Sequence, residues 1–69
     1  MHLNMVWRCN GIDLDLHGTY YPNRPGTLLD RLELVEVRVG RHDVLPVLAE
    51  EVAEEARKAL VAEAVGVKV

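Results

Sequence analysis

The chain has 69 residues, a length that limits it to one small domain over residues 1–69, and its formal net charge is −3. Hydrophobic residues make up 49% and charged residues 28%, a composition typical of folded proteins rather than disordered ones. The first residues lack a signal-peptide pattern, and no apolar run approaches the ~20 residues of a membrane span. We therefore expect a cytoplasmic protein without membrane contact. The single cysteine excludes an internal disulfide.

The strongest local signal is Asn10-Gly11, the dipeptide most typical of a two-residue type I′ hairpin turn, in which both residues need positive φ. It predicts antiparallel strands over Leu3–Cys9 and Ile12–Tyr20. One face then receives apolar pairs: Cys9 with Ile12, Trp7 with Leu14 and Met5 with Leu16. The other receives mostly polar pairs: Arg8 with Asp13, Val6 with Asp15 and Asn4 with His17. A shift of one residue would destroy this sorting, so turn chemistry and pattern predict the same register.

A third strand is predicted at Leu32–Val39, after a proline-rich irregular segment. Its apolar residues change phase: Val35, Val37 and Val39 share one face, whereas Leu32 and Leu34 fall on the other. A β-bulge around Leu34-Val35 would turn both sets inward, and the alternative is a strand that begins only at Leu34. The third strand pairs most simply with the second, although a position beside the first strand is also open.

One helix is predicted from Leu45 or Pro46 to Val65, with Asp43 in the capping position and Gly66 as the residue that stops it. Alternating spacings of three and four residues mark its buried stripe: Leu45, Leu48, Ala49, Val52, Ala53, Ala56, Ala59 and Leu60. The predicted fold class is therefore α+β. A three-stranded antiparallel sheet, made of the N-terminal hairpin and the third strand, is packed by one C-terminal helix.

So short a chain has a small core. Aromatic residues, which bury the most area each, make up only 4% of the sequence. We therefore expect stabilising contact with a second copy or with another protein. The candidate contact residues are valines that fall outside the helix stripe or follow it: Val61, Val65, Val67 and Val69. Tyr21 and Arg24 in the proline-rich loop form a second candidate surface, whose alternative role is a structural clasp. The leading hypothesis is a small, self-associating interaction or assembly module.

A metal-binding protein is one alternative. Asp13, Asp15 and His17 alternate along the second strand and so project from one face of the sheet. Two carboxylates and an imidazole are the ligand set of many iron, manganese and zinc sites. Against this, Arg8 opposes Asp13 and would more simply form a cross-strand ion pair, so alternating polar residues of a solvated face also explain the pattern.

A nucleic-acid-associated regulator is the other alternative, and it requires the arginines to converge on one face: Arg8, Arg24, Arg31, Arg38 and Arg41. The negative net charge disfavours it, because phosphate neutralisation dominates such binding. The chain has no serine, no nucleophile with a base at motif spacing and no glycine-rich phosphate loop. We therefore predict no enzymatic activity and no cofactor.

Several segments occur in an order that resembles a group of short proteins encoded in tailed phages and prophages. The segments are Gly18-Thr19-Tyr20-Tyr21-Pro22, Pro25-Gly26, Leu34-Val35-Glu36-Val37-Arg38-Val39 and Asp43-Val44-Leu45-Pro46-Val47-Leu48, followed by a glutamate-rich helix. The resemblance covers roughly residues 12–64. It implies a phage context and no known activity.

Overall fold

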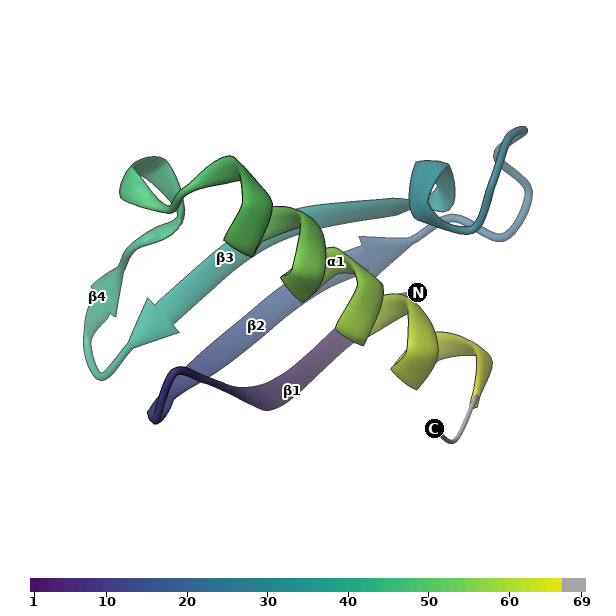
Figure 1. Ribbon diagram of the computed structural model, residues 1–69. Helices are drawn as coiled ribbons and strands as arrows, with labels where there is room; N and C mark the ends of the chain where they lie inside the picture. Colours follow the sequence, from purple (N-terminus) through teal and green to yellow (C-terminus); the bar gives the residue numbers. More distant parts are fainter. Residues whose placement is uncertain (67–69) are drawn as a thin grey trace.

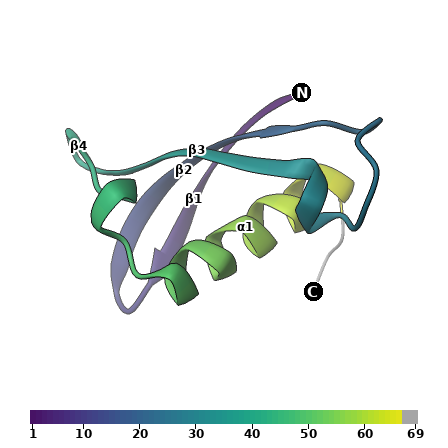
Figure 2. The ribbon, with the colours of Figure 1, turned by 90° about the horizontal axis from the view of Figure 1, so that it is seen from above.

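Four strands and one α-helix follow one another in the computed structural model, which describes residues 1–66. The strands are β1 (His2–Cys9), β2 (Ile12–Tyr20), β3 (Leu32–Val39) and β4 (His42–Asp43). Two 3₁₀ turns, η1 (Leu29–Arg31) and η2 (Leu45–Val47), precede β3 and the helix α1 (Glu50–Val65) respectively. The strands form one antiparallel sheet in the order β1-β2-β3-β4, and α1 lies across one face of it (Figures 1 and 2).

The predicted α+β class and the single C-terminal helix are confirmed, and β3 pairs with β2, the simpler of the two alternatives. The prediction of three strands is incomplete. Gly40 and Arg41 form a turn, after which His42 and Asp43 pair back with Val39 and Arg38 as β4. A two-residue strand is too short to show an alternating pattern, so the sequence carried no strand signal there.

The helix begins later than predicted. It starts at Glu50, and the residue before it, Ala49, makes no side-chain cap hydrogen bond. Asp43 is not its N-cap, because Asp43 belongs to β4 and its Oδ1 accepts the N–H of Leu45 in the 3₁₀ turn at 3.0 Å. The prediction of Asp43 as the helix cap is therefore wrong, and its carboxylate instead makes an Asx-type contact two residues along the chain. The helix ends at Val65, as predicted.

The hairpin turn adopts the conformation that the dipeptide predicted. Asn10 has φ 51° and Gly11 has φ 78°, so both turn residues are left-handed, as a type I′ turn requires. Cys9 faces Ile12 across the strand ends, and the pairing continues without a shift to His2 opposite Thr19. Every cross-strand pair predicted for the hairpin is therefore confirmed.

A β-bulge interrupts the pairing of β2 with β3. His17 pairs with Glu36 and Gly18 with Leu34, which leaves Val35 as the extra residue. The bulge occurs where the phase change predicted it, but Val35 does not share the inner face with the later valines and is 51% exposed. Gly18 makes the close approach possible, because a Cβ there would lie 2.9 Å from the carbonyl oxygen of Glu33.

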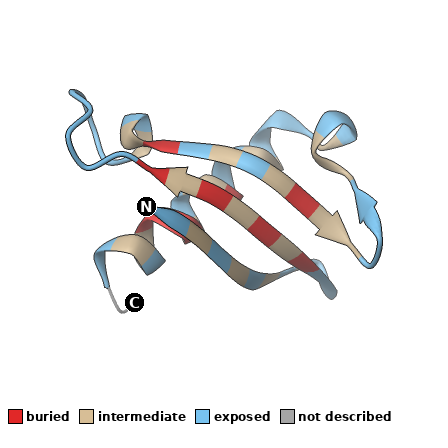
Figure 3. Cartoon of the chain, turned by 180° about the vertical axis from the view of Figure 1, so that it is seen from behind, coloured by how far each residue is buried: buried red, intermediate tan, exposed pale blue. Residues whose placement is uncertain are grey.

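The core lies between the sheet and α1. Its fully buried side chains come from three elements: Leu16 of β2, Val37 of β3, and Ala56 and Leu60 of α1. Buried and less buried residues alternate along β2, as one packed and one solvated face require (Figure 3).

Two expectations about burial were wrong. Ile12 was expected inside but lies exposed beside the turn, at the end of the sheet, and Ala49 precedes the helix and is exposed. Tyr20 is buried in the core. It ends β2 on the inner face, where alternation continues from Leu14 and Leu16.

Replacing Gly11 by Val tests the turn. A β-branched residue at positive φ is strained, and the space around Gly11 is open, so the cost is one of backbone conformation alone. We expect the unfolding free energy to fall by about 1–3 kcal/mol. Chemical denaturation followed by Trp7 emission measures it. Gly11→Asn is the control, because asparagine tolerates this conformation. Equal stability of the Val and Asn variants would contradict the type I′ turn.

Candidate interaction surfaces

An apolar groove lies between η1 and the C-terminal half of α1. It has a volume of about 470 Å³ and is lined almost entirely by apolar atoms. The lining residues are Thr27, Leu28, Leu29, Lys58, Val61, Ala62 and Val65. Two of the predicted contact residues, Val61 and Val65, therefore lie in one surface feature. Val67 and Val69, predicted as part of the same surface, lie outside the described residues.

Val61 and Val65 have different roles within the groove. Val65 is 40% exposed and was correctly placed outside the buried stripe. Val61 was placed outside the stripe as well, but it is only 8% exposed and belongs to the core cluster. The helix projection could not predict this burial, because η1, a segment distant in sequence, packs against α1 and lines the same groove as Val61. It is a core residue at the floor of the groove rather than a free contact residue.

The wall formed by the loop before β3 is held by hydrogen bonds. The Thr27 N–H donates to Oδ2 of Asp30 at 2.9 Å, and the Asp30 N–H donates to the Thr27 hydroxyl at 3.3 Å. The backbone donor of Thr27, and secondarily its hydroxyl, hold the pKa of Asp30 below its ordinary value of 3.8. Arg57 reaches across from α1 and donates from Nη2 to the Leu29 carbonyl at 3.4 Å, which joins the two walls.

Tyr21 and Arg24 pack on each other within the loop. The guanidinium carbon of Arg24 lies 4.1 Å from the centre of the Tyr21 ring, and the Tyr21 hydroxyl is 3.3 Å from Oε2 of Glu33. The Arg24 carbonyl also accepts a hydrogen bond from Nε of Arg31 at 2.8 Å. These contacts order the loop internally, which is the clasp that the sequence left as the alternative to a binding surface. Neither residue lines the groove.

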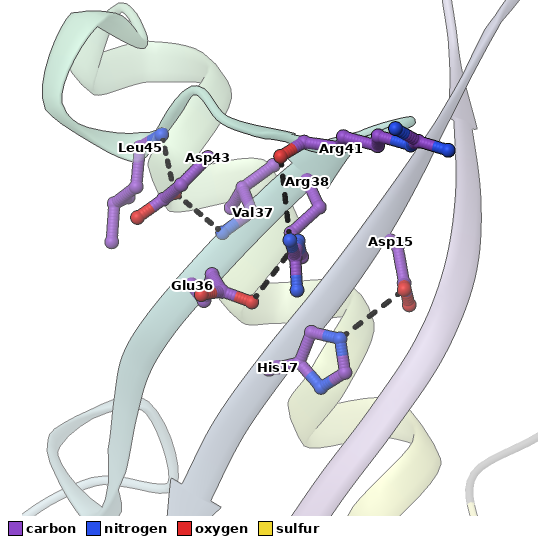
Figure 4. A network of polar contacts seen from close by, with 8 residues as sticks. All are labelled: Asp15, His17, Glu36, Val37, Arg38, Arg41, Asp43 and Leu45. Carbon is purple, nitrogen blue, oxygen red and sulfur yellow. Dashed lines mark hydrogen bonds and ion pairs between the residues drawn. The ribbon is translucent and has the colours of Figure 1, made fainter.

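The carboxylates of β2 contact neighbouring side chains. Asp13 forms an ion pair with Arg8 at 3.0 Å. Oδ2 of Asp15 lies 3.2 Å from Nε2 of His17 (Figure 4). The His17 ring also stacks on that of His2, with ring centres 6.0 Å apart. Within residues 1–66, no three His, Cys, Asp or Glu side chains gather as a metal site would require. The geometry gives the metal alternative no support.

The five arginines divide between the two ends of the sheet, with Arg8, Arg38 and Arg41 toward the end at the hairpin turn. Arg8 pairs with Asp13, and Arg38 lies 3.5 Å from Glu36, so positive and negative groups alternate on the solvated face. Arg24 and Arg31 belong to the loop and η1 at the opposite end of the strands from the hairpin turn. No continuous basic surface forms from these side chains, and nucleic-acid binding gains no argument from the structure.

The edge of the sheet at β1 is open. Met1 and Tyr20 exchange two backbone hydrogen bonds, of 2.7 and 2.8 Å, and hydrogen-bonded and non-bonded pairs alternate along an antiparallel ladder. The odd-numbered residues of β1 therefore bond to β2. The even-numbered residues direct their N–H and C=O groups away from the sheet: His2, Asn4, Val6 and Arg8. Among residues 1–66, no other segment pairs with this edge.

The opposite edge, at β3, is covered over the C-terminal part of the strand, from Val37 to Val39. The Val37 N–H donates to Oδ1 of Asp43 at 3.3 Å, and the Val37 carbonyl accepts the N–H of Val44 at 2.7 Å (Figure 4). β4 pairs with the end of the strand, and the bulge at Val35 distorts its middle. Bulges and short covering strands are common means of blocking a sheet edge. The β3 edge is thus paired at its C-terminal part and distorted in its middle, whereas no segment of residues 1–66 pairs with the β1 edge.

The side chains beside the open edge are apolar and incompletely covered. Leu3, Met5, Trp7 and Cys9 point to the inner face, pack against the core and are each only partly buried. Their neighbours on β2, Leu14 and Leu16, are buried. The apolar face of the sheet therefore continues to the β1 edge, where its side chains are less completely buried. The sequence did not indicate that β1 lies at an edge of the sheet, because the alternation of apolar and polar residues within a strand carries no information on strand order.

No family model, curated protein or solved structure matches the chain. Within residues 1–66, α1 is neither long nor apolar enough to cross a membrane.

Replacing Val61 or Val65 by alanine tests whether Val61 is a core residue and Val65 an exposed residue of the groove. Val61→Ala is expected to lower the unfolding free energy by about 1 kcal/mol, because buried methyl groups are lost. Val65→Ala is the matched control and is expected to stay within about 0.5 kcal/mol of the wild type. Both changes gain the same helix propensity, so their difference reports burial. Urea denaturation measures it. Equal effects would contradict the assignment of Val61 to the core.

Asp30 gives a pH-dependent test of the loop wall. Its folded-state pKa is lowered, so its stabilisation is present above the ordinary pKa of 3.8 and is lost as the pH falls through the folded-state value. We expect the stability advantage of the wild type over Asp30→Asn to shrink between about pH 5 and about pH 2.5. Denaturation of both proteins across this range measures the difference. A constant difference would show that the carboxylate charge has no role there.

Proposed function

We propose that this protein is a small interaction and assembly module that self-associates through the β1 edge. The observation that supports the proposal is the asymmetry of the two sheet edges. A bulge distorts the middle of the β3 edge and β4 with Asp43 covers its C-terminal part, whereas the outward backbone groups of four β1 residues have no partner within residues 1–66. An unprotected edge is a template for pairing with another strand.

The composition of β1 supports the same conclusion. Proteins that keep an edge strand unpaired commonly carry lysine, proline or an inward-pointing charge there. β1 has none of these, and its one full charge, Arg8, points to the solvated face and pairs with Asp13. The inner face of the strand carries Trp7 and Met5, whose remaining exposed area a second chain would bury at about 25 cal/mol per Å².

The remaining parts of the proposal come from the sequence. The role is non-catalytic, the location is cytoplasmic, and the setting is the phage or prophage context that the sequence resemblance implies. The contacts of Asp13 with Arg8 and of Asp15 with His17, and the pairing of Arg38 with Glu36, favour this role over the metal-binding and nucleic-acid alternatives.

A backbone variant tests the proposal. Val6 directs its N–H outward, so Val6→Pro removes a donor from the open edge without removing a β1–β2 hydrogen bond. We expect the wild type to increase in mass with concentration in sedimentation velocity, and Val6→Pro to remain a monomer. Val6→Ala is the control, since it loses the same exposed side chain but keeps the N–H.

The outcomes separate clearly. A wild type that stays monomeric at millimolar concentration would overturn self-association. Self-association that survives in a folded Val6→Pro variant, with Trp7 emission and melting like those of the wild type, would show that the contact lies elsewhere. Loss of association in Val6→Ala as well as in Val6→Pro would assign the contact to the side chain rather than to the backbone edge.

A further inference from the structure

We infer that two copies pair their β1 strands antiparallel about a two-fold axis at Met5, which joins their sheets into one continuous sheet of four strands from each copy. This inference rests on the proposed self-association and specifies its geometry. It follows from three constraints on β1: which backbone groups are free, which face each side chain takes, and how much of the strand each register pairs.

The first constraint is the direction of the free backbone groups. Only the even-numbered residues of β1 have N–H and C=O groups that point outward. In a two-fold antiparallel pair these residues must therefore face even-numbered residues of the second copy. The axis then passes through a residue rather than between two residues. Registers centred between residues would place outward groups opposite inward ones and are excluded.

The second constraint is the sorting of side chains. Pairing even with even residues keeps the odd-numbered apolar side chains of both copies on the same face, the face that α1 covers. Leu3 then faces Trp7 of the second copy, and Met5 faces Met5. On the solvated face, Asn4 faces Val6 and His2 faces Arg8 of the second copy. No carboxylate is buried in these pairs.

The third constraint selects among the registers that remain. An axis at Met5 pairs residues 1–9 of each copy, the whole of β1 with Met1. An axis at Asn4 pairs only residues 1–7 and leaves Trp7 opposite Met1 at the end of the ladder. An axis at Val6 pairs residues 3–9 and leaves His2 outside. The Met5 axis thus gives the most hydrogen bonds and the most apolar contact.

Such a dimer is closed. The two-fold axis uses the same edge of both copies, so no open β1 edge remains, and the outer edges of the joined sheet are the two protected β3 edges. Addition of further copies is blocked by β4 and the bulge. The asymmetry of the edges therefore favours a dimer over an open fibre.

Single-cysteine variants test the register. In a Cys9→Ala background, which removes the native thiol, each of Met5→Cys, Asn4→Cys and Val6→Cys brings two thiols together only if the axis passes through that residue. Opposite residues of an antiparallel pair are within disulfide reach, whereas residues displaced along the strand are not. With copper–phenanthroline as oxidant, Met5→Cys is expected to form covalent dimer on the order of tenfold faster than the other two.

A mixture of two variants tests the same register with substitutions on the solvated face only, so that no inner-face side chain near the axis is changed. Asn4 and Val6 of the two copies face each other in the Met5 register, so Asn4→Cys and Val6→Cys proteins mixed together are expected to crosslink as a heterodimer. The mixture also serves if Met5→Cys weakens the dimer.

Three results would overturn the inference. Faster self-crosslinking of Asn4→Cys or Val6→Cys would assign another register, with self-association retained. No crosslinking of any variant or of the mixture, in protein that doubles in mass, would remove β1 from the interface. Protein that remains monomeric would overturn the inference together with the proposed function.

Discussion

The left-handed turn at Asn10-Gly11 is the constraint on which the rest of the structure depends. It fixes the register of β1 against β2, and the register sorts apolar side chains to one face and charged ones to the other. α1 can cover the sheet because that face is uniformly apolar. The same register decides which backbone groups of β1 point outward, so the turn also determines what the open edge offers to a second chain.

A second constraint, the bulge at Val35, shapes the other half of the molecule. The extra residue lets both Leu32 and Val37 turn inward, although they differ in phase, and it distorts the strand at the edge farthest from β1. Asp43 then accepts the N–H of Val37, a backbone group that this edge would otherwise expose. Core packing and edge protection on this side thus have a common origin, whereas β1 pairs with β2 without a register shift and no other segment of residues 1–66 pairs with it.

Local chemistry made much of this fold predictable. Both hairpin strands, the bulge and the end of α1 follow from residues adjacent in sequence: Asn10-Gly11, the phase change at Leu34-Val35, and Gly66. The features that depend on contacts between residues distant in sequence were not predicted. Val61 was judged from the helix projection alone, whereas η1 packs against α1 and lines the same groove; β4 is too short for a pattern; and β1 becomes an edge only through the order of the strands. The candidate surface was therefore predicted only in part.

Amide hydrogen exchange tests most directly whether the β1 edge is the contact surface. Measured residue by residue in dilute and concentrated solution, the amides of Leu3, Met5 and Trp7 are expected to exchange slowly in both, because β2 protects them. The amides of Asn4, Val6 and Arg8 are expected to exchange rapidly when dilute and to slow as the concentration rises. Rapid exchange of these three amides at both concentrations, in a protein whose mass has doubled, would contradict pairing through β1.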